Sequence, residues 1–164
     1  MYSVDERDRV LELKDVPQSS VGAPMPIVLS NEHRVLLGYI MEETSAATAV
    51  DDDSHDEHFA LIDFAVYSSY MFGPPNDEAF EGHPLASRGL SPYGSFQIED
   101  SSWIRQLERM NSVHSNHIRF DRYKHFVFTF HDSTFECVAE GFTVSQHHGS
   151  FDSLVTTMQE RLWG

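Results

Sequence analysis

Residues 124–140, KHFVFTFHDSTFECVAE, decide the fold class. Apolar and polar side chains alternate on both sides of Asp132-Ser133, and these two residues are good turn formers, so the stretch predicts a β-hairpin. The alternation gathers the aromatic side chains on one face, which we expect to belong to the hydrophobic core. That face consists of Phe126, Phe128, Phe130, Phe135, Cys137 and Ala139.

The register of this hairpin follows from its apolar face. A two- or four-residue loop pairs Phe130 with Phe135 and Phe128 with Cys137, whereas a three-residue loop sets apolar side chains against polar ones. The opposite face is mostly polar, and it is either a solvated surface of the sheet or one wall of a pocket. It carries His125, Val127, Thr129, His131, Thr134, Glu136, Val138 and Glu140.

The only cysteine, Cys137, lies on the apolar face of the predicted hairpin. A catalytic thiolate needs an electropositive and partly exposed setting, so we expect this side chain to be a small buried hydrophobe. One cysteine forms no disulfide within the chain, and the first residues lack the basic and apolar regions of a signal peptide. Both observations favour the cytoplasm.

Other segments add strands and two helices to the hairpin. Branched and aromatic residues predict strands at 26–29, 34–42, 58–67 and 93–99, while 9–16 fits either a strand or a short helix. Apolar residues at helical spacing predict amphipathic helices near 101–111 and 150–162. Short turns between strands indicate an α+β fold, in which a mostly antiparallel sheet of about five to seven strands packs against two amphipathic helices.

A chain of 164 residues is expected to form a single domain, 1–164. Three segments of this domain lack a clear periodicity. We expect a loosely packed N-terminal segment at 1–24, an exposed acidic loop at 43–57 and a long loop at 71–92. Because long loops without regular structure are often functional, the last of these is the expected carrier of a site.

The charge of the chain is strongly negative and unevenly distributed. The formal net charge is −15, and residues 1–82 hold 17 acidic and 4 basic residues. Nucleic acids and anionic lipid surfaces need lysine and arginine, so we expect no nucleic-acid and no membrane partner. An acidic surface attracts basic proteins, although such a surface also serves solubility alone.

Histidines at close spacing make a divalent metal a candidate cofactor. His114 and His117 form a His-x-x-His pair in an expected loop, and His83 and Asp132 would complete a site if the fold gathered them. Ten histidines in one chain also produce such pairs by chance. Two alternatives therefore stay open. Either a metal binds at His83, His114, His117 and Asp132, or the chain binds no metal.

The candidate catalytic residues are His83, Asp132 and Glu136, because imidazoles and carboxylates serve as general acids and bases. The segment His131-Asp132-Ser133 holds the residue types of a catalytic triad, but adjacency favours an ordinary turn. The sequence contains neither a dinucleotide fingerprint nor a phosphate loop, so no cofactor-binding residues are predicted. Whether the chain is an enzyme stays open.

Two functions from different classes follow. We favour a ligand-binding or catalytic domain that takes a small molecule or a divalent metal in a His/carboxylate pocket formed by the 73–92 loop, the 114–117 loop and the 125–140 hairpin. The alternative is an acidic protein-interaction module of inhibitor or immunity type, which binds a basic protein. The first requires that His83, His114 and Asp132 converge, and the second that they are dispersed.

Overall fold

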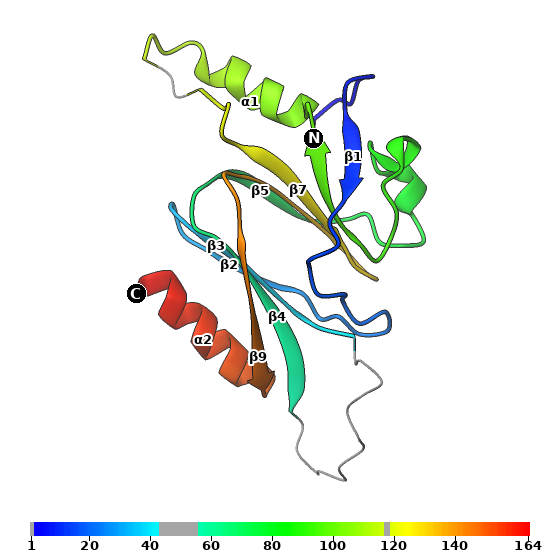
Figure 1. Ribbon diagram of the computed structural model, residues 1–164, viewed down its shortest axis with the longest axis vertical. Coiled ribbons are helices and arrows are strands. Elements are labelled where there is room, and N and C mark those ends of the chain that lie inside the picture. The colour runs from blue at the N-terminus through cyan, green and yellow to red at the C-terminus, as the bar shows by residue number, and fades with distance from the viewer. Residues whose placement is uncertain (1, 43–55, 117–118) are drawn as a thin grey trace.

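The computed structural model describes residues 2–42, 56–116 and 119–164, in which nine strands form two antiparallel sheets. The five-stranded sheet has the order β1 (Arg9–Glu12), β6 (Ser95–Glu99), β7 (Lys124–Thr129), β8 (Thr134–Ala139) and β5 (Tyr67–Gly73). The four-stranded sheet has the order β2 (Ile27–Ser30), β3 (Val35–Ile40), β4 (Glu57–Phe64) and β9 (Thr143–Gly149). Figure 1 shows helix α1 (Ser102–Asn111) beside the five-stranded sheet and α2 (Phe151–Trp163) beside the four-stranded one.

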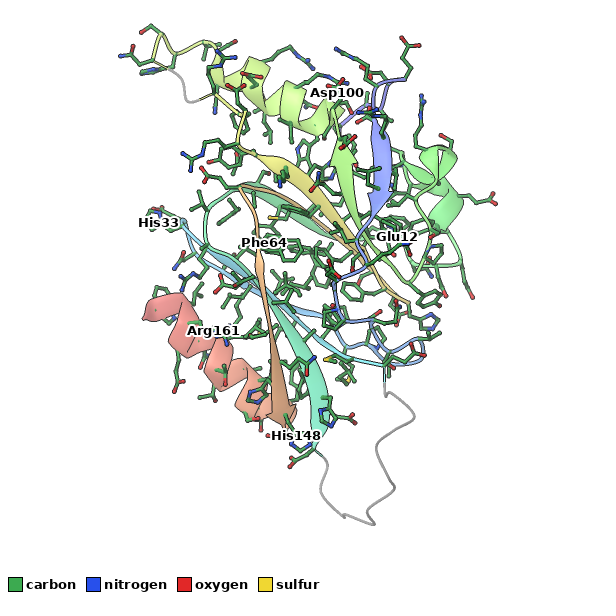
Figure 2. The ribbon with its side chains drawn as sticks, viewed as in Figure 1. Glu12, His33, Phe64, Asp100, His148 and Arg161 are labelled. Atoms are coloured by element: carbon green, nitrogen blue, oxygen red, sulfur yellow. The ribbon has the colours of Figure 1, made fainter. Side chains whose placement is uncertain are left out.

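The two sheets face each other across an aromatic core. Phe64 of β4 is fully buried there, and Figure 2 shows it between the sheets. The predicted apolar face of the hairpin supplies the other half of this core, and Cys137 is buried within it as expected. Burial raises the pKa of the Cys137 thiol, which keeps it protonated. The buried members are Val35, Leu37, Tyr39, Ala60, Ile62, Phe64, Phe126, Phe128, Phe130, Phe135, Cys137 and Ala139.

Helix α2 covers the outer face of the four-stranded sheet. Its Leu154 and Met158 are fully buried against Leu36, Phe59 and Leu61. A Cβ atom at Gly38 would lie 3.1 Å from Leu154 Cδ2, so glycine on β3 permits this close approach. Ser150 caps the helix by accepting a hydrogen bond from the Ser153 backbone N–H.

The outer face of the five-stranded sheet is covered by α1, by the segment that follows β5 and by the N-terminal residues. Val127 and Val138 project from the sheet into this second apolar cluster. Tyr2 is buried there and stacks on Trp103 with ring centroids 5.5 Å apart. Residues 1–24, for which loose packing was expected, therefore include side chains that are buried in the fold, and β1 pairs with β6.

The hairpin register differs from the predicted one by two residues. Phe128 lies opposite Phe135, and Phe126 opposite Cys137, because the loop spans four residues and the Phe130 N–H donates to the Ser133 carbonyl at 2.8 Å. A shift of two preserves the face of every side chain, so the apolar face was right and the cross-strand pairs were wrong. Most of the polar face is buried, while His131 and Glu140 are half-exposed.

The strand count exceeds the predicted five to seven because two edge strands were missed. Strand β9 was not predicted, and β5 extends into the segment expected to be a long loop from residue 71. Both strands carry polar side chains on a half-exposed edge, where a sheet does not require strict alternation. The rest of that segment contains two short 3-10 helices, η1 (Phe80–Gly82) and η2 (Ala86–Arg88). In the part of the chain described, no helix has the length and apolar character needed to cross a membrane.

Candidate functional site

A buried carboxylate, Glu136 of β8, is the centre of a polar network on the outer face of the five-stranded sheet. Its Oε2 atom accepts a hydrogen bond from the Tyr2 hydroxyl at 2.6 Å and one from His125 Nε2 at 2.8 Å. Its Oε1 atom lies 3.1 Å from His83 Nε2. All four residues are less than 10 % exposed, so the fold has taken an ionisable cluster out of water.

Each member of the network is positioned by a different element. Val127 lies directly opposite Glu136 in the β7–β8 ladder, which places His125 diagonally across the strands on the same face. His83 follows the 3-10 helix η1, and the ring of Phe80 stacks on it with centroids 5.7 Å apart. The Leu85 backbone N–H donates to His83 Nδ1 at 3.1 Å, which fixes the orientation of the imidazole.

The hydrogen bonds assign the proton positions in the network. His83 Nδ1 accepts a bond, so Nε2 carries the proton and donates it to Glu136. His125 Nε2 lies 2.8 Å from Glu136 Oε2 and its Nδ1 lies 2.9 Å from the Ser101 hydroxyl, so a proton on Nε2 allows Nδ1 to accept from Ser101. In this arrangement every donor of the network is matched to an acceptor.

Three donors compensate Glu136 for the loss of water. Burial alone raises the pKa of this carboxyl, but the hydrogen bonds from His125 and His83 outweigh burial and lower the pKa to about 2. Burial and the nearby Glu136 charge raise the pKa of the Tyr2 hydroxyl, which therefore stays a donor. The carboxylate is negative at neutral pH, although no arginine or lysine forms an ion pair with it among the described residues.

Ser101 connects this network to the surface. It is the N-cap of α1, and its hydroxyl oxygen accepts a 3.4 Å hydrogen bond from the Ile104 backbone N–H. Asp100, between β6 and Ser101, has a positive φ of 48°, so the chain turns sharply from strand to helix at this point. Figure 2 shows Asp100 at the end of β6 where α1 begins.

Ser101 also lines a groove of about 440 Å³ between α1, β6 and the residues that lead into β7. This volume lies within the range of small-molecule sites, ~300–1,000 Å³. The groove combines apolar and aromatic side chains with charged ones. Its lining consists of Gln97, Ile98, Glu99, Asp100, Ser101, Ile104, Arg105, Glu108, Phe120, Asp121, Tyr123 and Lys124.

Most charged side chains of the groove are already paired. Arg105 binds Asp100 at 2.7 Å, while the ion-pair partners of Glu99 and Asp121 lie outside the lining residues. Glu108 and Lys124 form no ion pair with another described residue. Carboxylates outnumber basic groups four to two along the lining, so the groove is net negative.

A second polar cluster lies at the hairpin loop. His131 Nδ1 is 2.9 Å from Asp77 Oδ2, and the Tyr93 hydroxyl donates to the same carboxylate oxygen. Hydrogen bonds from Tyr93 and His131 lower the pKa of Asp77, and the Asp77 carboxylate raises the pKa of His131. This half-exposed arrangement secures the segment after β5 to the hairpin.

The predicted site residues lie in different environments. His83 and Glu136 meet in the buried network, whereas Asp132 is exposed at the hairpin loop and His114 is exposed after α1. His117 and most of the expected acidic loop 43–57 lie outside the described residues. No set of three or more His, Cys, Asp or Glu side chains suited to a metal ion occurs in the described ranges, and the metal hypothesis stays a prediction.

Sequence reasoning missed the contributions of Tyr2, Ser101 and His125. Tyr2 is separated from Glu136 by 134 positions, and no local sequence pattern predicts a contact over that distance. Ser101 was expected only as the start of the helix near 101–111. His125 was placed on the polar face of the hairpin, which was the signal that could have joined it to Glu136.

Comparisons with protein-family models, with curated proteins and with solved structures give no significant match to this chain. The functional conclusion therefore depends on the geometry of the site.

Proposed function

We propose that the chain binds a small organic cation with an apolar body in the groove between α1 and the five-stranded sheet. The observation that carries this proposal is the lining of the groove, which is net negative and partly aromatic and includes Ser101, hydrogen-bonded to His125 of the buried network. The proposed site differs in place from the predicted His/carboxylate pocket, but it borders the network in which His83 and Glu136 meet.

The lining supports this ligand class by charge and by shape. Tyr123 offers a half-buried aromatic ring, and the buried ring of Phe120 lies 4.9 Å from it. Aromatic faces attract ammonium groups, and Glu108 is a carboxylate without an ion pair among the described residues. The net charge of −15 adds a field that draws cations toward the molecule. We also propose the cytoplasm as the compartment, since the single buried Cys137 needs no oxidising environment.

Benzylamine tests the proposal because it joins an ammonium group to an aromatic ring. Titration of the ¹⁵N-labelled protein should shift backbone resonances of α1, β6 and residues 120–124, with weaker shifts for uncharged benzyl alcohol. Glu108→Gln should weaken benzylamine binding ~5-fold, which corresponds to about 1 kcal/mol for a half-exposed charge.

Glu160→Gln on α2 is the matched control, because Glu160 is exposed on the opposite side of the sandwich and should leave the affinity unchanged. Equal binding of benzylamine and benzyl alcohol would contradict the charge preference. Shifts confined to surfaces away from the groove would contradict the proposed site.

The dispersal of His83, His114 and Asp132 favours the second candidate, an acidic module that binds a basic protein. Glu78 and Glu81 are exposed and supply acidic groups on the segment after β5. An octalysine peptide should then bind in a salt-sensitive manner, and Glu78→Gln with Glu81→Gln should weaken binding more than Asp152→Asn with Glu160→Gln on α2. If the two double variants weaken binding equally, Glu78 and Glu81 do not form a specific binding surface, and the acidity is a general property of the whole surface.

A further inference from the structure

We infer that Ser101, His125 and Glu136 form a nucleophile, base and orienting carboxylate that transfer an acyl or sulfonyl group from a ligand in the groove. This inference rests on the proposed function, since the ligand occupies the same groove. The Ser101 hydroxyl lies 2.9 Å from His125 Nδ1, and His125 Nε2 lies 2.8 Å from Glu136 Oε2. Such a chain of contacts is the defining arrangement of a serine nucleophile, recognised by geometry and not by sequence order.

The proton positions suit this role. With the Nε2 proton of His125 held by Glu136, Nδ1 is the ring nitrogen that accepts the proton of Ser101. The Glu136 carboxylate stabilises the imidazolium that forms when His125 takes the serine proton. Tyr2 and His83 hold that carboxylate in place, so Glu136 is a positioning residue and Ser101 and His125 are the catalytic residues.

The backbone around Ser101 also fits a nucleophile. The residue lies at a sharp strand-to-helix turn, after Asp100 with its positive φ and before ten residues of α1. The positive end of the helix dipole lies at Ser101 and favours negative charge that develops on a bound carbonyl or sulfonyl oxygen. Ser101 is 2 % exposed and lines the groove, so the inference requires that a ligand approach its hydroxyl from the groove.

The reaction conserves atoms and charge in two steps. The Ser101 oxygen bonds to the acyl carbon of an ester while its proton passes to His125 Nδ1, and the leaving alcohol departs with that proton. Water then attacks the acyl carbon and gives a proton to His125 Nδ1. The bond between the Ser101 oxygen and the acyl carbon breaks, the acid leaves, and the Ser101 oxygen takes this proton from His125 Nδ1. With a sulfonyl fluoride, the Ser101 oxygen bonds to sulfur, the S–F bond breaks, and fluoride leaves with the proton that passed from Ser101 to His125 Nδ1.

An aminoethyl benzenesulfonyl fluoride is the direct probe, because it carries a cationic amine and an aromatic ring. Intact mass and peptide mapping should show one adduct on Ser101, formed faster than with the neutral phenylmethanesulfonyl fluoride. Ser101→Ala and Ser101→Asn should each lose this adduct, and asparagine retains a side-chain oxygen that can cap α1. Ser112→Ala, at the other end of the same helix, should label at the rate of the unchanged protein.

Glu136→Gln tests the positioning role and should slow labelling of Ser101 by ~100-fold. A second measurement on the Glu136→Gln variant is the ¹⁵N chemical shifts of the His125 ring. These shifts should show that the Nε2–H form is lost. Circular dichroism confirms that each variant is folded. Should Glu136→Gln unfold, the milder Tyr2→Phe, which removes one donor to the carboxylate, takes its place and should slow labelling to a smaller degree.

The outcomes separate this inference from the proposed function. Labelling of Ser101 that Ser101→Ala abolishes supports the inference. Benzylamine binding without Ser101 labelling overturns the inference and leaves the groove as a binding site. Ser101 labelling without benzylamine binding supports the nucleophile but removes the cation preference. Absence of both results overturns both, and adducts spread over tyrosine and lysine side chains overturn the inference.

Discussion

Replacing Glu136 by leucine is expected to lower the free energy of unfolding by about 3–5 kcal/mol. Leucine leaves the Tyr2 hydroxyl and the Nε2–H groups of His83 and His125 buried without an acceptor, and each unmatched donor costs ~1–3 kcal/mol. Urea denaturation followed by circular dichroism measures the change.

Glu140→Leu is the control for this substitution, one residue beyond β8. Glu140 pairs with an exposed Arg122, and exposed pairs contribute less than about 1 kcal/mol. Equal losses for the two variants would mean that the buried network contributes no more than a surface ion pair.

The Glu136 network also makes the free energy of unfolding depend on pH in the acidic range. The folded pKa of Glu136 is about 2, below its ordinary value of 4.5. The stabilisation is therefore complete above pH 4.5 and is lost as the pH falls from 4.5 toward 2. We expect the difference between the unchanged protein and Glu136→Leu to shrink by about 1 kcal/mol between pH 7 and pH 4. A difference that stays constant over this range would contradict an ionised Glu136.

Replacing Phe64 by alanine is expected to cost about 3–5 kcal/mol, because it opens a cavity between the two sheets. Phe64 is fully buried, and its ring lies 5.6–6.1 Å from the rings of Phe126, Phe128, Phe135 and Phe142. The urea midpoint should fall while the dependence of stability on urea stays unchanged.

Phe72→Ala is the matched control for the core. Phe72 is 44 % exposed on the edge strand β5, so its truncation should cost less than about 1 kcal/mol. If both phenylalanines cost the same, the aromatic side chains between the sheets are not the main core of the fold.

The sequence predicted those parts of the fold that a short repeat encodes. The two-residue period of the 124–140 stretch assigned every hairpin side chain to the correct face, and helical spacing located both helices. The edge strands β5 and β9 escaped prediction because half-exposed strands tolerate polar side chains. The hairpin register escaped because a two-residue shift leaves the faces unchanged.

The site was only partly predictable for a different physical reason. His83 and Glu136 were singled out by residue type, and the fold brings them within 3.1 Å. Tyr2, Ser101 and His125 complete the network from segments far apart in the chain, and a contact of that kind is set by tertiary packing. Ser101 shows the difficulty plainly, because one hydroxyl both caps a helix and faces an imidazole.

The tautomer of His125 decides whether Ser101 is a nucleophile, because the proposed transfer requires an unprotonated Nδ1 beside Ser101. Long-range ¹H–¹⁵N correlation spectra at pH 7 report the protonation of each ring nitrogen, and His125→Gln assigns the signals. We expect a neutral ring with the proton on Nε2 and none on Nδ1. A ring protonated on Nδ1, alone or together with Nε2, would show that Ser101 has no base to accept its proton.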